Sequence, residues 1–272
     1  MMPEESVVVV SDLVVQYGDR TILDRISLDI RRGEVLVLLG GSGSGKSTLL
    51  RHLIGLETPV SGSIVVEGVD ITRCSEAELN QVRRLIGVSF QDAALFASMT
   101  VSENVAFPLM ERTRLADSTI EKVVLLKLAQ VGLVHFGALY PSELSGGMQK
   151  RASVARATAL DPEIMFFDEP SAGLDPITAA GIDELVVYLK NALQMTVLVV
   201  THELQSAFNI ADRLAFLRDG KLVAIGPKDS IVHSADPWVR RFLDRVPDRT
   251  SNDKTELLEQ LAERLGVPCP KN

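Results

Sequence analysis

Apolar residues occur along the chain in short runs with two kinds of spacing. Residues 7–10 and 13–17 are rich in valine, and residues 26–30 alternate strictly between apolar and polar side chains. Both patterns predict strands, the second with one buried face. Residues 35–39 are apolar at every position, which is typical of a central strand covered on both faces. Residues 46–54 then place leucines at helical spacing before Gly55 and predict a helix.

Strands and helices alternate along most of the remaining chain. A mostly helical block, from about residue 92 to 160, interrupts this alternation. Inside it, Ser118 and Glu121 predict a capping box that opens a helix ending near Gln130. The pattern predicts an α/β layer architecture with a helical insertion. Outside the block we expect strands at 63–69, 86–90, 164–167, 197–200, 214–217 and 221–225, and helices at 75–84, 178–193 and 203–211.

The composition changes after Val246. Residues 248–254 are polar and charged, and residues 255–265 place four leucines on one stripe, which predicts a short amphipathic helix. We therefore expect one large domain over residues 1–245 and a tail over residues 246–272. The leucine stripe fits packing on its own subunit or docking on a neighbouring chain.

Charge and cysteine content narrow the class of protein. The chain has 272 residues, 46% of them hydrophobic, and a formal net charge of −8, which argues against broad nonspecific binding to nucleic acid. Cys74 and Cys269 form no CxxC pair, so neither a disulfide framework nor a cysteine metal site is expected, and a reducing cytosol is predicted. The first ten residues do not read as a signal peptide, and no apolar run approaches the ~20 residues that cross a bilayer. Any membrane role is therefore expected to act through a partner.

Residues 40–48 read GGSGSGKST and match the pattern GxxxxGK[ST] without a gap. Glycines let the backbone curl so that its N–H groups point at phosphate oxygens, and the following helix presents its positive end. In this pattern Lys46 neutralises the terminal phosphates and Ser47 coordinates Mg²⁺. The predicted phosphate-binding residues are Gly40, Gly41, Ser42, Gly43, Ser44, Gly45, Lys46, Ser47 and Thr48.

Two carboxylates follow the apolar run 164–167. A buried strand ending in Asp168 and Glu169 delivers both to the carboxyl edge of the sheet, where ligands bind in such folds. We expect Asp168 to hold Mg²⁺ and Glu169 to polarise an attacking water. Without the phosphate loop, the same pattern would describe a strand that ends in a solvated acidic turn.

Residues 144–148, LSGGM, precede a predicted helix that contains Lys150, Arg151 and Arg156. Backbone N–H groups at a helix N-terminus form an anion site, so a second phosphate contact is predicted here. Taken alone, the segment also fits an ordinary capped junction between a loop and a helix.

Together these motifs resemble the ABC-type ATPases over about residues 7–240. Residues 40–47 look like the Walker A motif, 144–148 like the signature motif and 164–169 like the Walker B motif. Residues 171–175 resemble the D-loop. Gln91, His202 and Tyr17 stand where the family has its Q-loop glutamine, its H-loop histidine and an aromatic residue against adenine. One departure is Met148, where the commonest signature ends in glutamine.

This resemblance implies a P-loop NTPase fold. The family combines a RecA-like mixed sheet with an N-terminal antiparallel β subdomain and an inserted helical signature subdomain. It also implies that two copies pack head to tail, with each ATP held between the Walker A motif of one chain and the signature and D-loop of the other. The residues expected in trans are Leu144, Ser145, Gly146, Gly147, Met148 and Asp175.

The same resemblance assigns the chemistry. Lys46, Gln91, Glu169 and His202 are expected to be catalytic, and Ser47, Gln91 and Asp168 to hold Mg²⁺. ATP hydrolysis would reopen the closed dimer and move membrane permease subunits that contact residues 92–109.

A narrower resemblance concerns the transported substrate. Residues 91–96 (QDAALF), residues 99–109 and residues 173–178 (GLDPIT) look like the ATPases of Mla-type phospholipid transporters. This implies lipid transport between the inner and outer membranes of bacteria, which maintains envelope asymmetry. It also implies an MCE-domain lipid-binding protein, a small accessory subunit and a position on the cytoplasmic side of the inner membrane. Two alternatives remain open, namely the ATPase of an amino-acid or other small-solute importer and a non-transporting ABC ATPase that regulates cell division.

Overall fold

The computed structural model describes residues 5–246, and the chain divides into two compact units, Met1–His233 and Ser234–Asn272. The predicted tail helix at 255–265 and Cys269 lie outside the described residues. The domain boundary after residue 245 stays a prediction. Among residues 5–246, no helix combines the length and apolar character needed to cross a membrane.

The first sheet is antiparallel and has the strand order β2-β1-β4-β5. Its strands are β1 (Ser6–Tyr17), β2 (Arg20–Arg31), β4 (Ser61–Val66) and β5 (Val69–Asp70). The two strands predicted between residues 7 and 17 are one strand, whose pairing with β2 shifts register between Val10 and Leu13. Asp12 adopts a left-handed φ of 46° there, so the polar break in the valine pattern is a bulge within the strand.

The second sheet positions the site residues. It has the order β10-β9-β3-β8-β7-β6, and every neighbouring pair is parallel except β9 with β10. Because parallel strands end at one edge of a sheet, residues that follow β3, β6, β7 and β8 are brought together. The strands are β3 (Val35–Leu39), β6 (Ile86–Ser89), β7 (Ile164–Asp168), β8 (Thr196–Thr201), β9 (Arg213–Arg218) and β10 (Lys221–Pro227).

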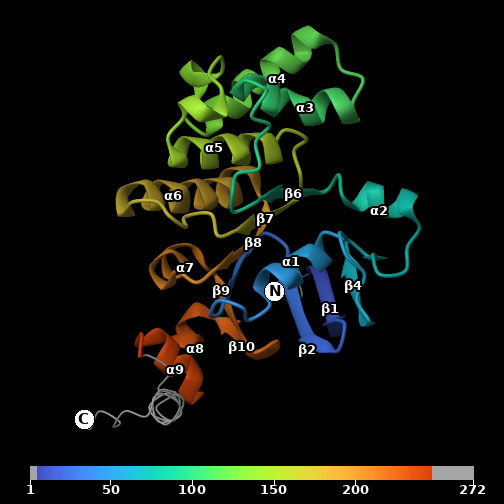
Figure 1. Cartoon of the computed structure of the whole chain (residues 1–272), viewed down its shortest axis with the longest axis vertical. Helices are drawn as coiled ribbons and strands as arrows, with labels where there is room; N and C mark the ends of the chain where they lie inside the picture. Colours follow the sequence, from blue (N-terminus) through green and yellow to red (C-terminus); the bar gives the residue numbers. More distant parts are fainter. Residues whose placement is uncertain (1–4, 247–272) are drawn as a thin grey trace, which may run out of the picture. The chain divides into compact units, whose positions relative to one another are not determined.

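Helices cover this sheet and form a separate block. In the first unit, α3 (Val101–Arg112), α4 (Asp117–Gln130) and α5 (Gly146–Ala157) gather at the top in Figure 1. Two short 3₁₀ helices, η1 (Val134–Phe136) and η2 (Pro141–Glu143), connect α4 to α5. The other helices of this unit are α1 (Lys46–Leu53), α2 (Glu76–Val82), α6 (Pro176–Leu193), α7 (Leu204–Ile210) and α8 (Lys228–Val232). In the second unit, Asp236 caps α9 (Pro237–Leu243) by accepting from the backbone N–H groups of Trp238 and Val239.

The start of α4 corrects one prediction. The N-cap is Ala116, which makes no side-chain cap, so the capping box expected from Ser118 and Glu121 is wrong. The Ala116 carbonyl already accepts from the N–H groups of Thr119 (2.8 Å) and Ile120 (3.0 Å), so Ser118 lies inside the helix. A capping box is present instead at Thr100 and Glu103, at the start of α3.

The predicted mixed α/β fold with an antiparallel N-terminal sheet is confirmed. All five residues of β3 are buried, and so are Ile164, Met165, Phe166 and Phe167 of β7. Removing such apolar area from water contributes about 25 cal/mol per Å² and holds both strands rigidly in the sheet. The loops that leave these strands are therefore anchored at one end by the core.

Candidate functional site

The phosphate loop leaves β3 and leads directly into α1. Gly45 is the N-cap of α1 with a φ of 104°, which a residue with a Cβ rarely adopts. A Cβ at position 40 would lie 2.3 Å from the carbonyl oxygen of Leu217, so only glycine fits against β9. Ser44 Oγ is buried and has no hydrogen-bond partner among the described residues. The loop thus encloses a polar atom that a phosphate oxygen can satisfy.

Lys46 closes this loop. Its ammonium group is buried and donates to the carbonyl oxygens of Gly40 (2.8 Å) and Gly41 (3.0 Å). Burial lowers the pKa of Lys46, while the charges of Glu169 and Asp168 oppose that shift. This buried cation, which faces two carboxylates, suits an anionic ligand. Binding would neutralise the charge of the ligand as well as that of the ammonium group.

Asp168 ends β7 beside the phosphate loop. Its Oδ1 accepts a hydrogen bond of 3.3 Å from Ser47 Oγ. Burial raises the pKa of Asp168, the hydrogen bond from Ser47 opposes the shift, and the charge of Glu169 adds to it. A hydroxyl beside a carboxylate is the oxygen donor set that Mg²⁺ uses when it keeps several of its waters. Within residues 5–246 no group of three or more His, Cys, Asp or Glu side chains is arranged to hold a metal by itself.

Glu169 and His202 meet at the ends of adjacent strands. Glu169 Oε1 lies 2.8 Å from His202 Nδ1, and Glu169 Oε2 accepts from Thr201 Oγ1 at 3.0 Å. The carboxylate is buried, with 8% of the residue exposed, whereas His202 is exposed. Glu169 adopts a left-handed φ of 49°. The pair is therefore held by the end of β8, and the imidazole side is open to a ligand.

The signature segment begins α5. Ser145 is the N-cap and accepts a hydrogen bond of 3.3 Å from the backbone N–H of Met148. Asp175 caps α6 in the same way, accepting from Ile177 and Thr178, and a hydrogen bond from the Thr178 hydroxyl lowers its pKa. A Cβ at Gly147 would lie 2.3 Å from Thr178 Cγ2, so the two caps are packed together. In its own chain the signature thus contacts the start of α6.

Two predicted residues lie at the rim of the site. Tyr17 is 50% exposed, and its hydroxyl is hydrogen-bonded to Glu57, which also pairs with Arg51 at 3.0 Å. The hydrogen bond to Glu57 raises the pKa of Tyr17. Gln91, also exposed, follows β6, and its backbone carbonyl accepts from Lys150. The ring of Tyr17 is available for stacking, and the Gln91 side chain is available for a ligand.

The structure brings the residues of the phosphate loop, Asp168, Glu169 and His202 together at one sheet edge. The sequence interpretation missed Thr201, which holds Glu169, and Glu57, which orients Tyr17. It also missed the hydrogen bond of 3.1 Å from Ser171 to Glu203, which joins the loop after β7 to the loop after β8. Thr201 and Glu203 flank His202, so their position beside a predicted site residue was the one available signal.

Comparison with known proteins decides the family. The family model described as ABC transporter matches residues 23–172, which is more than half of the chain. The chain belongs to the ABC transporter family. The chain therefore contains an ABC ATPase domain, which binds ATP.

Individual relatives of this ABC chain have two kinds of name. It is 44% identical to the probable ribonucleotide transport ATP-binding protein mkl of Mycobacterium leprae, over 89% of its own length and 70% of that protein. It is 42% identical to the intermembrane phospholipid transport system ATP-binding protein MlaF of Haemophilus influenzae, over 90% of its own length and 92% of that protein. Against MlaF of Escherichia coli K12 the identity is 43%, over 87% and 88%.

Solved structures of ABC proteins share the fold. The ATP-binding cassette MJ0796, in a dimeric post-hydrolysis state bound to ADP and Pi, aligns with a TM-score of 0.75 at 32% identity, over 81% of this chain and 98% of that one. The cbiO1 protein of Clostridium perfringens aligns with a TM-score of 0.79 at 29% identity, over 94% of this chain and all of that one.

The raised pKa of Asp168 generates a stability prediction. A carboxyl group whose pKa is higher in the folded chain binds its proton more tightly there, so its ionised form destabilises the fold at pH values above that pKa. Asp168→Asn should therefore raise the free energy of unfolding of the nucleotide-free chain at pH 7.5, because the amide has no charge to desolvate. The gain should shrink as the pH falls through the raised pKa towards the ordinary value for aspartate.

Urea unfolding at several pH values measures this difference. Asp175→Asn is the matched control of opposite sign, because the pKa of Asp175 is lowered and its ionised form favours the fold at pH 7.5. A loss of stability in Asp168→Asn at pH 7.5 would contradict the electrostatic interpretation of the site.

Proposed function

We propose that this chain is the ATP-hydrolysing subunit of a membrane ABC transporter that moves phospholipid between bacterial membranes. The observation that carries the proposal is the joint placement of Lys46, Glu169 and His202 at the sheet edge, with the signature motif turned towards its own α6. The relatives named MlaF support the lipid substrate, because the similarity covers about nine-tenths of both chains.

Hydrolysis would use the residues of the sheet edge. Lys46 exchanges the carbonyls of Gly40 and Gly41 for phosphate oxygens and stabilises charge that develops on the transferring phosphoryl group. Glu169, held by Thr201, orients the attacking water, and His202 lies on the open side of that carboxylate, towards the terminal phosphate. Tyr17 stacks on the adenine ring from the rim.

Mg²⁺ is proposed as the cofactor. Ser47 and Asp168 present hard oxygen atoms 3.3 Å apart, and Gln91 would add an amide oxygen from the loop after β6. The ion would neutralise the phosphate charges. Ser47 and Asp168 would fix the position of this positive charge, and burial of the Asp168 carboxylate, which raises its pKa, supports a cation at this place.

A second copy of the chain would complete the site. Ser145 and Gly147 present backbone N–H groups at the start of α5, where an anion can bind. Leu144, Gly146 and Met148 adjoin them in the sequence, and Asp175 caps the neighbouring helix α6. In a head-to-tail pair these groups bind the γ-phosphate held by Lys46 of the partner, so loss of that phosphate removes the contact and the dimer opens. The dimeric state of the MJ0796 cassette supports this arrangement.

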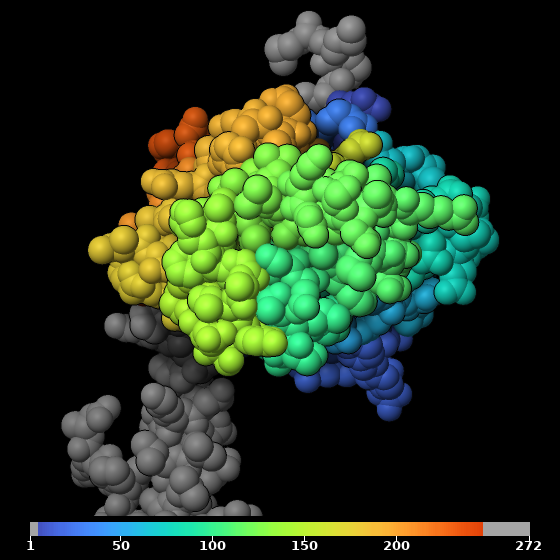
Figure 2. All heavy atoms as spheres, turned by 90° about the horizontal axis from the view of Figure 1, so that it is seen from above, coloured from blue at the N-terminus to red at the C-terminus, as the bar shows by residue number. Residues whose placement is uncertain are grey.

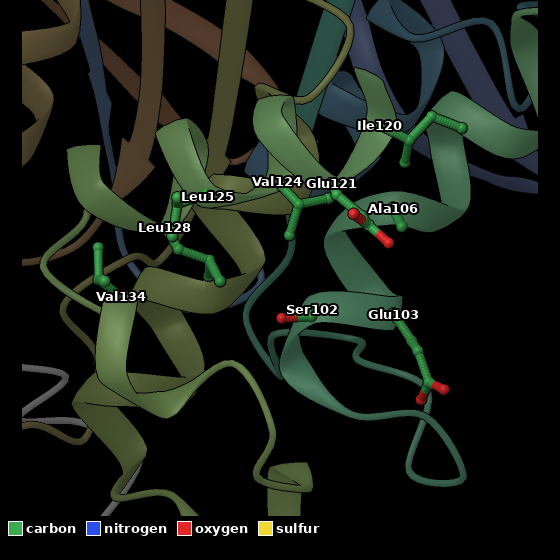
Figure 3. A pocket seen from close by; sticks show the side chains of 9 residues that line it. All are labelled: Ser102, Glu103, Ala106, Ile120, Glu121, Val124, Leu125, Leu128 and Val134. Carbon is green, nitrogen blue, oxygen red and sulfur yellow. The ribbon is translucent and has the colours of Figure 1, made fainter. Parts of the chain in front are cut away.

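The permease is proposed to dock on residues 92–109 and the adjoining pocket. That pocket, of about 370 Å³, lies between α3 and α4 (Figure 3), in the helical block that covers the face seen in Figure 2. Its centre is apolar and Glu103 and Glu121 add two acids, so it fits a short helix with an apolar face and a basic residue. Its lining residues are Ser102, Glu103, Ala106, Ile120, Glu121, Val124, Leu125, Leu128 and Val134.

The remaining parts of the proposed complex follow from the resemblance to Mla-type phospholipid transporters. They are an MCE-domain lipid-binding protein, a small accessory subunit and a peripheral position on the cytoplasmic side of the inner membrane. A second candidate function is import of a nucleotide or another small polar solute. The name of the mkl relatives favours it, since their identities of 44% and 45% slightly exceed those of the MlaF proteins.

A prediction about the dimer follows from the role of Glu169. Glu169→Gln removes the carboxylate that orients water and keeps the phosphate contacts, so the variant should stay dimeric with ATP and Mg²⁺ and hydrolyse at least about 100-fold more slowly. Light scattering after gel filtration measures the mass. Adding Ser145→Arg to this variant should abolish the dimer, because the arginine side chain fills the signature surface. A monomeric Glu169→Gln chain with ordinary turnover would overturn the two-copy site.

A further prediction concerns the partner and its cargo. Purification of the full-length chain from its native membrane in mild detergent should yield a permease and an MCE-domain protein with bound phospholipid, identified by mass spectrometry. Arg156→Met changes a side chain that donates to the carbonyl oxygen of Ala94, within the proposed docking segment 92–109. Met110→Ala changes an exposed side chain outside the pocket and is the control. Only Arg156→Met should weaken recovery of the permease. A permease with a solute-binding protein and no phospholipid would replace lipid transport with solute import.

A further inference from the structure

Lys150 is a buried cation that the hydrolysis mechanism does not use. It lies in α5, five residues after Ser145, and only 8% of it is exposed. A lysine is rarely buried to this extent unless its ammonium group is well bonded. Its partners are therefore informative about what the side chain does.

Both partners of Lys150 are backbone carbonyls at the predicted catalytic edge. The ammonium group donates to the carbonyl oxygen of Gln91, which follows β6, and to that of Glu169 at 3.3 Å, which follows β7. Because β6 and β7 are parallel neighbours, one side chain joins the loops that leave two adjacent strands. Burial lowers the pKa of Lys150, and the charges of Asp92, Asp168 and Glu169 oppose that shift.

Arg156 provides a second attachment of α5 to the same loop. Its guanidinium donates to the carbonyl oxygens of Ala94 (2.7 Å) and Ala93 (3.2 Å) and lies 5.8 Å from the centre of the Phe96 ring. The helix that starts at the signature thus grips the loop of residues 91–96 at two points.

The backbone at these contacts is held in an unfavourable conformation. Ala93, Ala94 and Glu169 all have left-handed φ angles, of 58°, 50° and 49°. Residues with a Cβ keep such angles only where surrounding contacts enforce them. Lys150 and Arg156 donate to the carbonyl groups of these three residues and of Gln91, so the two cations are among the contacts that hold this geometry.

We propose that Lys150 is a positioning residue that ties the Gln91 loop to the hydrolytic carboxylate, by bonding both backbone carbonyls with one ammonium group. The proposal rests on the proposed ATPase function. A displacement of residues 91–96 by the permease then changes the position of Glu169, and the signature helix moves with both. The hydrogen bonds of Lys150 go to backbone carbonyls, so it acts on turnover through Gln91 and Glu169.

Steady-state hydrolysis by the full-length chain tests this role. Lys150→Met keeps the apolar stem and removes the donors, so kcat should fall about 10-fold to 100-fold, the effect of a small misplacement of a reacting group. The KM for ATP should stay within about two-fold, because the phosphate loop and Tyr17 are untouched. Lys150→Arg restores donors and should recover most of kcat. Unchanged kcat in Lys150→Met would overturn the proposal.

Lys127→Met is the matched control. Lys127 is another buried lysine of the helical block, but it pairs with Asp161 at 2.5 Å, outside the predicted site. This variant should lower the thermal midpoint and keep the wild-type kcat at a temperature where it is folded. An equal loss of kcat in both variants would mean that any buried lysine of the block has this effect, which contradicts the specific role.

A double-mutant cycle with Glu169→Gln separates positioning from general damage. If Lys150 acts by positioning the Glu169 carboxylate, the double variant should lose no more activity than Glu169→Gln alone, whereas independent effects would multiply. If Lys150→Met does not fold, Lys150→Gln retains one donor group and should give an intermediate kcat. An inactive wild-type chain would remove the proposed function itself, and an active wild type with additive losses would remove only the role of Lys150.

Discussion

The parallel pairing of β3, β7 and β8 is the constraint on which the site depends. Leu39 pairs with Thr201, and Asp168 pairs with Val200, so the three strands end within about one residue of each other. Gly40, Glu169 and His202 therefore leave adjacent strands at one level. Close packing of the side chains on both faces of these strands fixes that register, because a slip of one residue would exchange the side chains of the two faces. Packing in the core of the sheet, away from the ligand, thus positions the residues proposed to bind phosphate, bind metal and activate water.

Electrostatics explains why binding of a charged ligand should stabilise this arrangement. The nucleotide-free chain buries Lys46 near Asp168 and Glu169, and burial moves the pKa of Lys46 down and that of Asp168 up. Each charged form is therefore costly where it stands. The buried cation is complemented by phosphate, and the carboxylate by a divalent cation, so both costs fall when a metal nucleotide binds. The proposed second copy would supply the remaining wall, and the energy of closure would then depend on the γ-phosphate.

Most strands and the loops that carry the candidate site could be predicted from the sequence, whereas several local backbone features could not. Three features of the sequence were sufficient to predict the fold, because each has a period or spacing of its own. They are the strand-sized apolar runs, the glycine loop after residues 35–39 and the carboxylates after residues 164–167. Three features were not predictable in this way. The bulge at Asp12 joins two expected strands, the cap of α4 is a plain backbone carbonyl at Ala116, and Lys150 binds the carbonyls of Gln91 and Glu169. Every residue has a carbonyl, so such contacts leave no pattern in the sequence.

The central claim is that one ATP site is built from two chains, and a mixture of two defective chains tests it most directly. In the Glu169→Gln background, a Lys46→Ala chain lacks the phosphate loop contact and a Ser145→Arg chain lacks the signature contact. Neither should dimerise alone with ATP. Mixed together, they should form heterodimers that hold one ATP per dimer, counted after gel filtration, because one composite site remains intact. No heterodimer in the mixture, or a dimer formed with ATP by either defective chain alone, would contradict the account.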